Sequence, residues 1–256
     1  MAIDDRAHQQ RERAESFGSV AGEYHRYRPG YPRELVADLV ALRPASVLDI
    51  GCGTGKAALL LTASGLRVLG VEVDPRMAEV ARAHGLDVEV GSFEQWDGRG
   101  RTFDLITCAQ AWHWVDPAAG IPKAARLLAP GGTVALFWNY DEPDSDTRAV
   151  LDDVYERGAP GLRASFASGA RRRAHREYAD DLRASGSFGD VATRTYSWQR
   201  AVPLEQWLGR FGTHSDHLAL GPRRLDTLLR ELRAALGGRE IMLTGGTYVI
   251  LARAGV

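Results

Sequence analysis

Short apolar runs alternate with helical stretches along the first 140 residues of the chain. The runs have the length of buried strands. They cover residues 47–50, 66–71, 86–90, 103–108 and 133–138, and further strand patterns cover 191–200 and 247–252. Strands that alternate with helices predict an α/β domain with a mostly parallel sheet. Ligands of such sheets bind beyond the carboxyl ends of the strands, so chemistry is expected in the segments that follow the runs.

Three alternating glycines follow the first run, in the segment Asp49-Ile50-Gly51-Cys52-Gly53-Thr54-Gly55. Glycine permits a strand-to-helix turn with positive φ and lets a large polar ligand lie on the backbone. A dinucleotide fingerprint requires a small third residue, where Lys56 stands, and a phosphate loop requires a hydroxyl where Ala57 stands. The spacing Asp-x-Gly-x-Gly-x-Gly instead resembles the first motif of class I S-adenosylmethionine (SAM) dependent methyltransferases.

The resemblance implies a set of cofactor contacts. Asp49 would help to hold the ammonium of SAM, and Glu72, at the end of the second run, would accept hydrogen bonds from both ribose hydroxyls. Ser92 stands where many relatives carry an acid for the adenine, so backbone groups and Phe93 are expected to contribute more of the adenine contacts. The implied SAM contacts in this core are Asp49, Gly51, Gly53, Glu72, Ser92, Phe93 and Gln110.

An aromatic stretch from Gln110 to Asp116 follows the run at 103–108. Because it follows a central strand, we expect it to face the reactive end of the cofactor. A carboxylate acceptor is already ionised at neutral pH and needs no base, whereas a hydroxyl, amine or enolisable carbon benefits from one. His113 is the first candidate for that base and His214 the second. The expected substrate contacts are Tyr27, Trp112, Trp114 and Asn139.

The segment before the first strand, from Ala21 to Pro32, is rich in tyrosine and arginine. It is similar to the A-x-x-Y-x-x-Y-R-P-x-Y-P segment that folds over the cofactor in one branch of these methyltransferases. Tyrosine rings can stack on a sulfonium and a guanidinium can meet its carboxylate, so Tyr24 and Arg28 are expected cofactor contacts. An amphipathic helix packed on the sheet edge is the alternative interpretation.

Together with Gln110–Asp116 and Thr213–Ser215, this segment resembles the small-molecule branch that includes trans-aconitate methyltransferase. The resemblance implies a Rossmann-like, doubly wound, seven-stranded sheet that is mostly parallel, with an antiparallel last strand and a helical substrate lid. We expect one domain over residues 1–256. Its expected parts are a cofactor-covering segment at 1–34, a SAM-binding core at 35–140, a helical lid insertion at 141–190, and C-terminal strands and helices at 191–256.

Composition narrows the picture further. The chain has 256 residues, 45% apolar content and a formal net charge of −1, which gives no electrostatic footprint for nucleic acid or an anionic membrane. Acids follow the basic run Arg171–Arg173 at helical distances, which favours a solvated helix face. The chain shows neither a signal-peptide pattern nor an apolar run of membrane-spanning length, so we expect a cytoplasmic protein without membrane contact.

Cysteine and histidine usage argues against a metal centre. Cys52 and Cys108 end two expected core strands and are interpreted as reduced, partly buried thiols. His214 and His217 are close in sequence, but no cysteine or acid set completes a ligand pattern around them. We therefore expect no bound metal.

The resemblance implies a SAM-dependent methyltransferase that acts on a small-molecule acceptor, with a carboxylate, a hydroxyl or a natural-product-like character. Methyl transfer would proceed by in-line displacement without a metal and would release S-adenosyl-L-homocysteine. A nonenzymatic SAM-binding protein of the same fold is the alternative, and a nicotinamide oxidoreductase is a third hypothesis. The sequence does not name the acceptor, the atom methylated or the oligomeric state.

Overall fold

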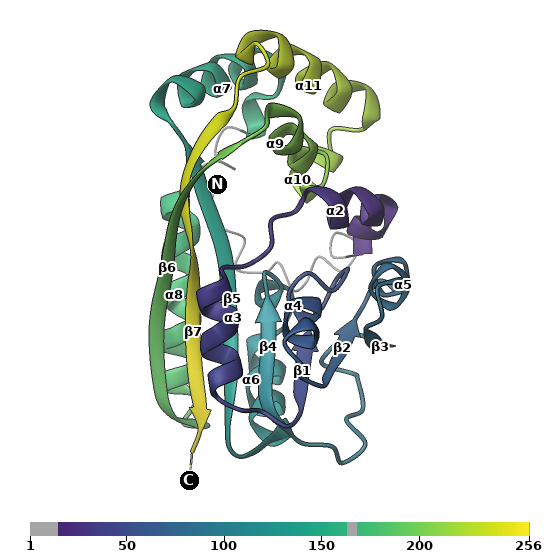
Figure 1. Ribbon diagram of the computed structural model, residues 1–256, viewed down its shortest axis with the longest axis vertical. Helices are drawn as coiled ribbons and strands as arrows, with labels where there is room; N and C mark the ends of the chain where they lie inside the picture. The colour runs from purple at the N-terminus through teal and green to yellow at the C-terminus, as the bar shows by residue number, and fades with distance from the viewer. Residues whose placement is uncertain (1–14, 163–167, 256) are drawn as a thin grey trace.

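The computed structural model describes residues 15–162 and 168–255, so residues 1–14 of the expected cofactor-covering segment lie outside it. A seven-stranded sheet of order β3-β2-β1-β4-β5-β7-β6 forms its centre (Figure 1). The strands are β1 (Val47–Ile50), β2 (Val68–Glu72), β3 (Asp87–Val90), β4 (Phe103–Ala109), β5 (Leu128–Pro143), β6 (Phe188–Val202) and β7 (Ile241–Ala254). β7 is antiparallel to both of its neighbours, and the other pairings are parallel. The expected fold class is therefore confirmed.

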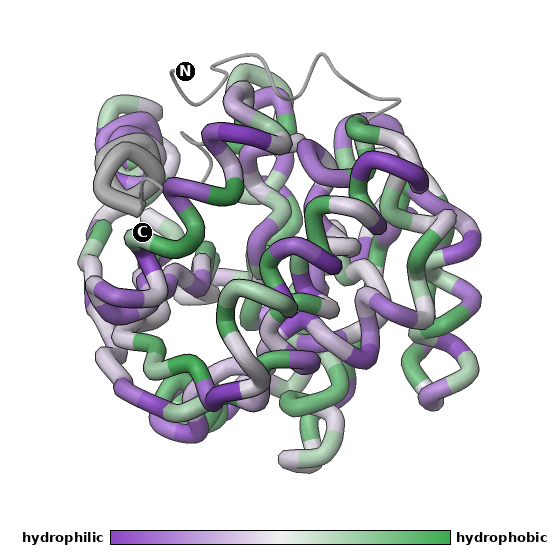
Figure 2. Tube along the Cα trace, turned by 90° about the horizontal axis from the view of Figure 1, so that it is seen from above, coloured by the Kyte–Doolittle hydropathy of each residue, from purple (hydrophilic) through white to green (hydrophobic). Residues whose placement is uncertain are grey.

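Helices cover both faces of the sheet, which explains why its central strands are continuous apolar runs rather than alternating ones. The helical elements are η2 (Glu15–Val20), α2 (Ala21–Tyr27), α3 (Arg33–Ala41), α4 (Ala58–Ala63), α5 (Pro75–Ala83), η3 (Trp112–Trp114), α6 (Pro117–Leu127), α7 (Ser145–Gly158), α8 (Ser168–Ala184), α9 (Leu204–Phe211), α10 (Ser215–Leu218) and α11 (Pro222–Leu236). Seen from above, hydrophilic and hydrophobic segments alternate along the helical trace, as amphipathic helices require (Figure 2). Among the described helices, none combines the length and the apolar character that crossing a membrane requires.

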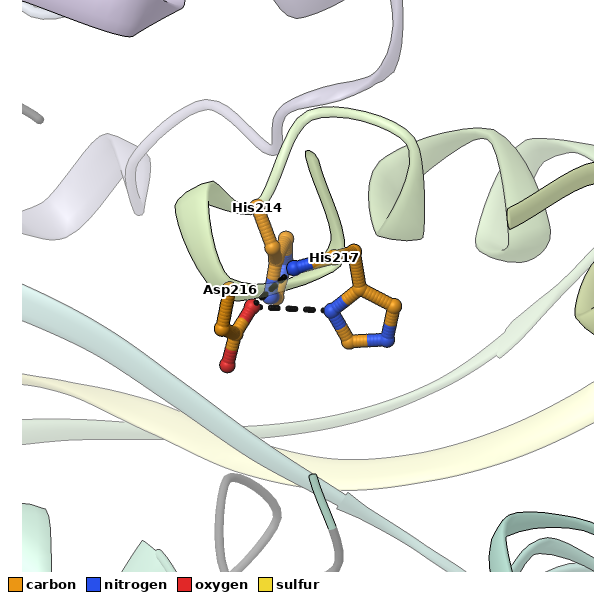
Figure 3. Close-up of side chains that lie close together, drawn as sticks. All are labelled: His214, Asp216 and His217. Atoms are coloured by element: carbon orange, nitrogen blue, oxygen red, sulfur yellow. Dashed lines mark hydrogen bonds and ion pairs between the residues drawn. The ribbon is translucent and has the colours of Figure 1, made fainter. Parts of the chain in front are cut away.

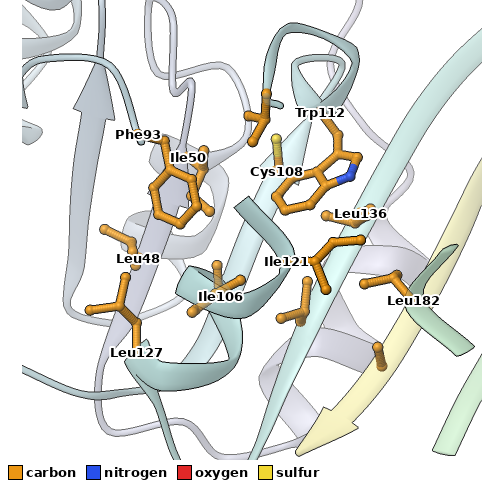
Figure 4. Close-up of a cluster of buried hydrophobic side chains, with 14 of the residues drawn as sticks. Leu48, Ile50, Phe93, Ile106, Cys108, Trp112, Ile121, Leu127, Leu136 and Leu182 are labelled. Carbon is orange, nitrogen blue, oxygen red and sulfur yellow. The ribbon is translucent and has the colours of Figure 1, made fainter. Parts of the chain in front are cut away.

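The largest core cluster lies between the sheet and helices α6 and α8. Leu48, Ile106 and Leu136 contribute side chains from β1, β4 and β5, and Ile121 of α6 packs onto them (Figure 4). Leu182 of α8 belongs to the same cluster. A second cluster on the sheet joins residues of α3 and α4 to β1, β4 and β5. These two layers fix the positions of the strand ends, where the candidate site lies.

Three strands extend well beyond the others and carry a group of helices at their far ends (Figure 1). β5 continues to Pro143, although the apolar run predicted a strand only over 133–138. The polar residues 139–143 are extended because they pair with 243–247 of β7, which no local pattern indicates. We call α7, α9, α10 and α11 the helical cap; a separate apolar cluster drawn from α7, α9, α11 and the ends of β6 and β7 holds it together.

The residues expected to form a lid, 141–190, take two different places. α7 belongs to the helical cap and packs against α11. α8 lies along the sheet instead, with Ala179 and Leu182 in the main core cluster (Figure 1). Residues 163–167 and the side chains of Arg171–Arg173 lie outside the described part. The covering of a substrate by this insertion stays a prediction.

Candidate cofactor and acceptor site

The glycine loop after β1 has the backbone that its sequence predicts. Gly51, Gly53 and Gly55 have positive φ angles of 61°, 57° and 83°. A Cβ atom at Gly51 would lie 2.6 Å from the Cβ of Ala111, in the loop that follows β4. Glycine is therefore required at position 51 both by the turn and by the close approach of a second loop. The two strongest motifs of the sequence are in direct contact here.

Glu72 lies at the end of β2 with its carboxylate fixed against the glycine loop. Its Oε2 accepts a hydrogen bond from the Gly53 N–H at 2.8 Å, and its Oε1 accepts one from the Asp74 N–H at 2.9 Å. Burial raises the pKa of Glu72, and these two backbone donors oppose that shift. Each carboxylate oxygen keeps a further lone pair, so the side chain can also accept hydrogen bonds from hydroxyl groups of a ligand.

Asp49 is the buried acid of the loop motif. Its Oδ1 accepts a hydrogen bond from the Thr107 hydroxyl at 2.7 Å, while Oδ2 is buried with no hydrogen-bond partner among the described residues. The hydroxyl oxygen of Thr54, in the glycine loop itself, is also buried and lacks a partner in that part of the chain. Burial raises the pKa of Asp49 to about 7, and the charge of Glu72 adds to this. Unpartnered buried oxygens are costly, so they mark positions where a ligand would supply donors.

These atoms fit SAM. The cofactor carries an ammonium, which would supply the cation and donor that Asp49 Oδ2 lacks, and a ribose, whose hydroxyls match the fixed carboxylate of Glu72. The glycine loop adds an open backbone without the magnesium-binding hydroxyl of a phosphate loop, since Ala57 stands at that position. Ser92 and Phe93 follow β3 at the same edge of the sheet; Phe93 is 4% exposed and Ser92 is half-buried.

The loop after β4 contains a strained residue. Gln110 has a φ of 63°, which is uncommon for a residue other than glycine. Its N–H donates to the carbonyl of Phe137 at 2.9 Å, and its side-chain Nε2 donates to the carbonyl of Asn139 at 3.4 Å. Strain of this kind is typical of functional sites, because the surrounding structure has to maintain it. The position lies beside the glycine loop, through the adjacent Ala111.

The three aromatic residues of η3 have different environments. Trp112 is 1% exposed and packs with Phe93 in the main core cluster, so its indole is part of the core beneath the loop that follows β4 (Figure 4). His113 and Trp114 are half-buried, with ring centroids 4.8 Å apart. Phe17 of η2 meets Trp114 edge-on at 6.2 Å and Tyr24 at 5.9 Å. The sequence treated Trp112 and Trp114 alike, but only Trp114 contacts the N-terminal segment.

The N-terminal segment, which we define as residues 15–32, crosses the carboxyl edge of the sheet between α5 and the helical cap (Figure 1). The Gly18 N–H donates to Asp74 Oδ2 at 3.0 Å, and Lys56 Nζ donates to the carbonyl of His25 at 3.0 Å. Both partners, Asp74 and Lys56, follow the motif residues of the candidate cofactor site by a few positions. The segment is thus tied to the loops that would hold SAM.

The same segment is also tied to β5 and to the helical cap. Arg28 donates from Nε to the Thr213 hydroxyl at 2.9 Å and from Nη2 to the Thr213 carbonyl at 2.7 Å, and its guanidinium lies 5.0 Å from the ring centroid of Tyr24. The ring of Tyr27 lies against Gly209 of α9, where a Cβ atom would be 2.5 Å away. Asn139 Nδ2 donates to the carbonyl of Gly30 at 3.0 Å.

His214 lies at the start of α10 and is close to Asp216 and His217 (Figure 3). Its Nε2 is buried and has no hydrogen-bond partner within the described ranges. Burial lowers the pKa of His214 well below 6.5, and the charge of Arg28 adds to the shift, so the ring is neutral at physiological pH. A neutral imidazole in this place can accept a proton or a hydrogen bond.

The structure supplies the acid that the sequence did not associate with the two histidines. Nitrogen and oxygen atoms of His214, Asp216 and His217 lie within 4.8 Å of one another. His217 already uses Nδ1 with Asp216 Oδ1 at 2.8 Å and Nε2 with the hydroxyl of Tyr155 at 2.6 Å. This hydrogen-bond chain accounts for the group without a metal, and the absence of a metal stays a prediction.

An ion pair between Arg210 of α9 and Asp141 of β5 was not anticipated. The Nη2 of Arg210 lies 2.8 Å from Asp141 Oδ2, and the two side chains are 12% and 11% exposed. The Nε and Nη1 atoms of Arg210 are buried without a partner in the described chain. The sequence carried no signal for this pair, because the two residues are 69 positions apart and belong to elements of ordinary composition.

Comparison with known proteins finds similarity to methyltransferases. Residues 48–136, from β1 to β5, match a methyltransferase domain family. An uncharacterised methyltransferase of Mycobacterium tuberculosis is 45% identical over 127 residues, which cover 48% of this chain and 52% of that protein. The chain thus spans about half the length of the curated relatives it matches.

Solved structures extend the likeness beyond the matched segment. A protein from Anaeromyxobacter dehalogenans, provisionally named a type II methyltransferase, has a TM-score of 0.62 and 26% identity over 89% of this chain and 98% of its own. A Haemonchus contortus phosphoethanolamine N-methyltransferase in complex with S-adenosylhomocysteine shares the fold, with a TM-score of 0.55, 15% identity, and coverage of 95% and 60%. The architecture is the Rossmann-like methyltransferase fold.

Proposed function

We propose that this protein is a SAM-dependent methyltransferase that methylates a small-molecule acceptor and releases S-adenosyl-L-homocysteine. The observation that carries the proposal is the pair of acids at the glycine loop. Asp49 Oδ2 is buried and has no hydrogen-bond partner among the described residues, and Glu72 is fixed by two backbone donors beside it. This donor and acceptor pattern supports an ammonium at the first acid and a ribose at the second.

The N-terminal segment supports a small acceptor. It is bonded to the glycine-loop region through Lys56 and to the helical cap through Arg28, so it lies across the space between the proposed cofactor loops and the helical cap. Tyr24 and Tyr27 belong to that cover. The formal net charge of −1 favours a small molecule over nucleic acid as the partner. The resemblance to the branch that includes trans-aconitate methyltransferase is a part of the same proposal.

Bound SAM would supply a methyl group activated by its sulfonium: the acceptor would bond to the methyl carbon in line as the methyl–sulfur bond breaks, and S-adenosyl-L-homocysteine would leave. The residues of the chain then have three tasks. Asp49 and Glu72 hold the two polar ends of the donor, the N-terminal segment excludes water, and the helical cap aligns the acceptor. His113 and His214 are the proposed bases for an acceptor that must lose a proton. Because the pKa of His214 is lowered, its ring is neutral at pH 7, which is the form that a base requires.

The test is a transfer assay with methyl-labelled SAM and a panel of carboxylic acids, phenols and amines. Calorimetry first establishes that the protein binds SAM and S-adenosyl-L-homocysteine but not NAD(H). We expect the label in at least one class of acceptor. A protein that is demonstrably loaded with SAM and methylates no acceptor would be the nonenzymatic SAM-binding protein instead. Binding of NAD(H) in place of SAM would favour the oxidoreductase hypothesis.

A further inference from the structure

Arg210 has donors that the protein does not use. Its Nη2 contacts both oxygens of Asp141, at 3.1 and 2.8 Å, which fixes the plane of the guanidinium. The Nε and Nη1 atoms of the same group have no hydrogen-bond partner in the described ranges, although both are buried. Arginine rarely leaves buried N–H groups unsatisfied, since each unmade bond of a charged group costs free energy. Asp141 thus orients the guanidinium of Arg210, while its Nε and Nη1 atoms can still donate hydrogen bonds to a ligand.

Other donor groups gather around Arg210. The positive charges of Arg28 and Arg210 both contribute to the lowered pKa of His214, so the three side chains are electrostatic neighbours. Burial also lowers the pKa of Arg200, with a further contribution from Arg210 and an opposing one from Asp141. Asp141 is thus the acid that faces Arg200 and Arg210. The cluster combines the cations Arg28, Arg200 and Arg210 and one neutral imidazole with two acids, Asp141 and Asp216. The excess of positive charge favours a negatively charged ligand.

The cluster lies on the same side of β5 as the candidate cofactor site. Phe137, Asn139 and Asp141 alternate along the strand and so share one face. Phe137 meets the ring of Tyr31 at 4.9 Å between centroids, Asn139 bonds the backbone of the N-terminal segment, and Asp141 holds Arg210. Asp49 contributes to the raised pKa of Tyr31, which relates this face to the glycine loop. At a rise of about 3.3 Å per residue, Asp141 is roughly 13 Å further along the strand than Phe137.

We infer that Arg210, oriented by Asp141, binds a carboxylate of the methyl acceptor, and that the acceptor is therefore an organic acid. The inference rests on the proposed function. The Nε and Nη1 atoms that Asp141 leaves unused can each donate a charge-assisted hydrogen bond to a carboxylate oxygen, and Asp141 holds the guanidinium in place before the ligand arrives. His214 Nε2, which is also buried and without a partner in the described part, provides a second polar contact for the same acceptor. The helical cap thus selects the acceptor by charge.

The test compares acids with their neutral isosteres in the full-length protein. Saturation-transfer NMR without cofactor would use benzoate and citrate as probes, with benzamide as the neutral partner of benzoate. We expect both acids to bind and benzamide not to bind. The Arg210→Gln variant should lose the binding of the acids, whereas Arg230→Gln, which removes an exposed ion pair on α11, should keep it. Equal binding of benzoate and benzamide, or full binding of both acids by Arg210→Gln, would overturn the inference.

A second arm separates this inference from the proposed function. With methyl-labelled SAM, the Arg210→Gln variant should keep its affinity for S-adenosyl-L-homocysteine while the KM for an acid acceptor rises by about 10- to 100-fold, the range for a lost charged hydrogen bond. Arg210→Lys keeps the charge without the planar fork and should fall between the two. Turnover of amides or phosphate monoesters in place of carboxylic acids would overturn the assignment with the methyltransferase function intact. Failure to bind SAM would reject the proposed function, while the NMR arm still decides whether Arg210 binds carboxylates.

Discussion

The two halves of the candidate site are built in different ways. On the cofactor side, residues 49–116 supply the glycine loop, the acid of β2 and the loop after β4 from one continuous stretch. On the acceptor side, Arg28 bonds Thr213 across 185 positions and Arg210 bonds Asp141 across 69. The cofactor side depends on backbone conformation and strand ends, whereas the acceptor side depends on side chains that only tertiary structure brings together. A local pattern can therefore reveal the donor but not the acceptor.

The largest expected effect breaks the cofactor side at Gly51. A Gly51→Ala substitution places a Cβ atom 2.6 Å from Ala111 and pushes the loop after β4 away from the glycine loop. We expect SAM affinity, measured by calorimetry, to fall by about 100-fold, because small displacements in a preorganised site are costly. Gly65→Ala is the matched control: its φ is 88°, but nothing lies within 4 Å of the added atom. It should lower the free energy of unfolding by about 1 kcal/mol and leave SAM affinity unchanged.

The next effect concerns Glu72. In Glu72→Gln the amide cannot accept from both the Gly53 and the Asp74 N–H groups, and it offers the ribose no charged acceptor. We expect SAM affinity to fall by about 10- to 100-fold in calorimetry. The control is Glu79→Gln on α5, the helix that follows β2, where the residue is exposed. Unchanged affinity in Glu72→Gln would mean that the ribose is held by other groups.

The order of these effects reflects what the sequence could and could not predict. Gly51, Gly53 and Glu72 were recognisable because each performs a task that few residue types perform: a positive φ, or a charge at a strand end. The strands of the sheet were also predictable, because buried strands require continuous apolar runs. The length of β5 beyond Trp138 did not, because its polar end is stabilised by pairing with β7. Arg210 could not be distinguished from the other arginines of the chain, because its burial beside Asp141 depends on how α9 docks.

Asp49 offers a test of the cofactor side through pH. Its pKa is about 7 because of burial, and the ammonium of SAM beside Oδ2 would favour the ionised form. Binding at neutral pH should then release a proton. SAM affinity should rise by up to about tenfold per pH unit as the pH approaches 7 from below, and it should level off above that value. Calorimetry in buffers of different ionisation enthalpy measures the proton directly. Asp49→Asn should release none, and a flat affinity from pH 6 to 8 in the natural chain would argue against a cation at Asp49.

The smallest expected effect is on the free energy of unfolding, and it tests the acceptor side through His214. The pKa of His214 is lowered in the folded protein, while in the unfolded chain it is near 6.5. Above pH 6.5 the ring is neutral in both states; as the pH falls below that value the unfolded state takes up a proton that the folded state refuses. The free energy of unfolding should therefore fall with acidification, by at most about 1.4 kcal/mol per pH unit. In His214→Gln the loss between pH 7 and 5, measured by urea denaturation, should be smaller. Other groups titrate in the same range: His25, whose pKa burial also lowers, adds to the loss, and Asp49, whose pKa burial raises to about 7, opposes it. Identical slopes in the two proteins would show that His214 is solvated, and the acceptor side would then lack the neutral imidazole that we assign to it.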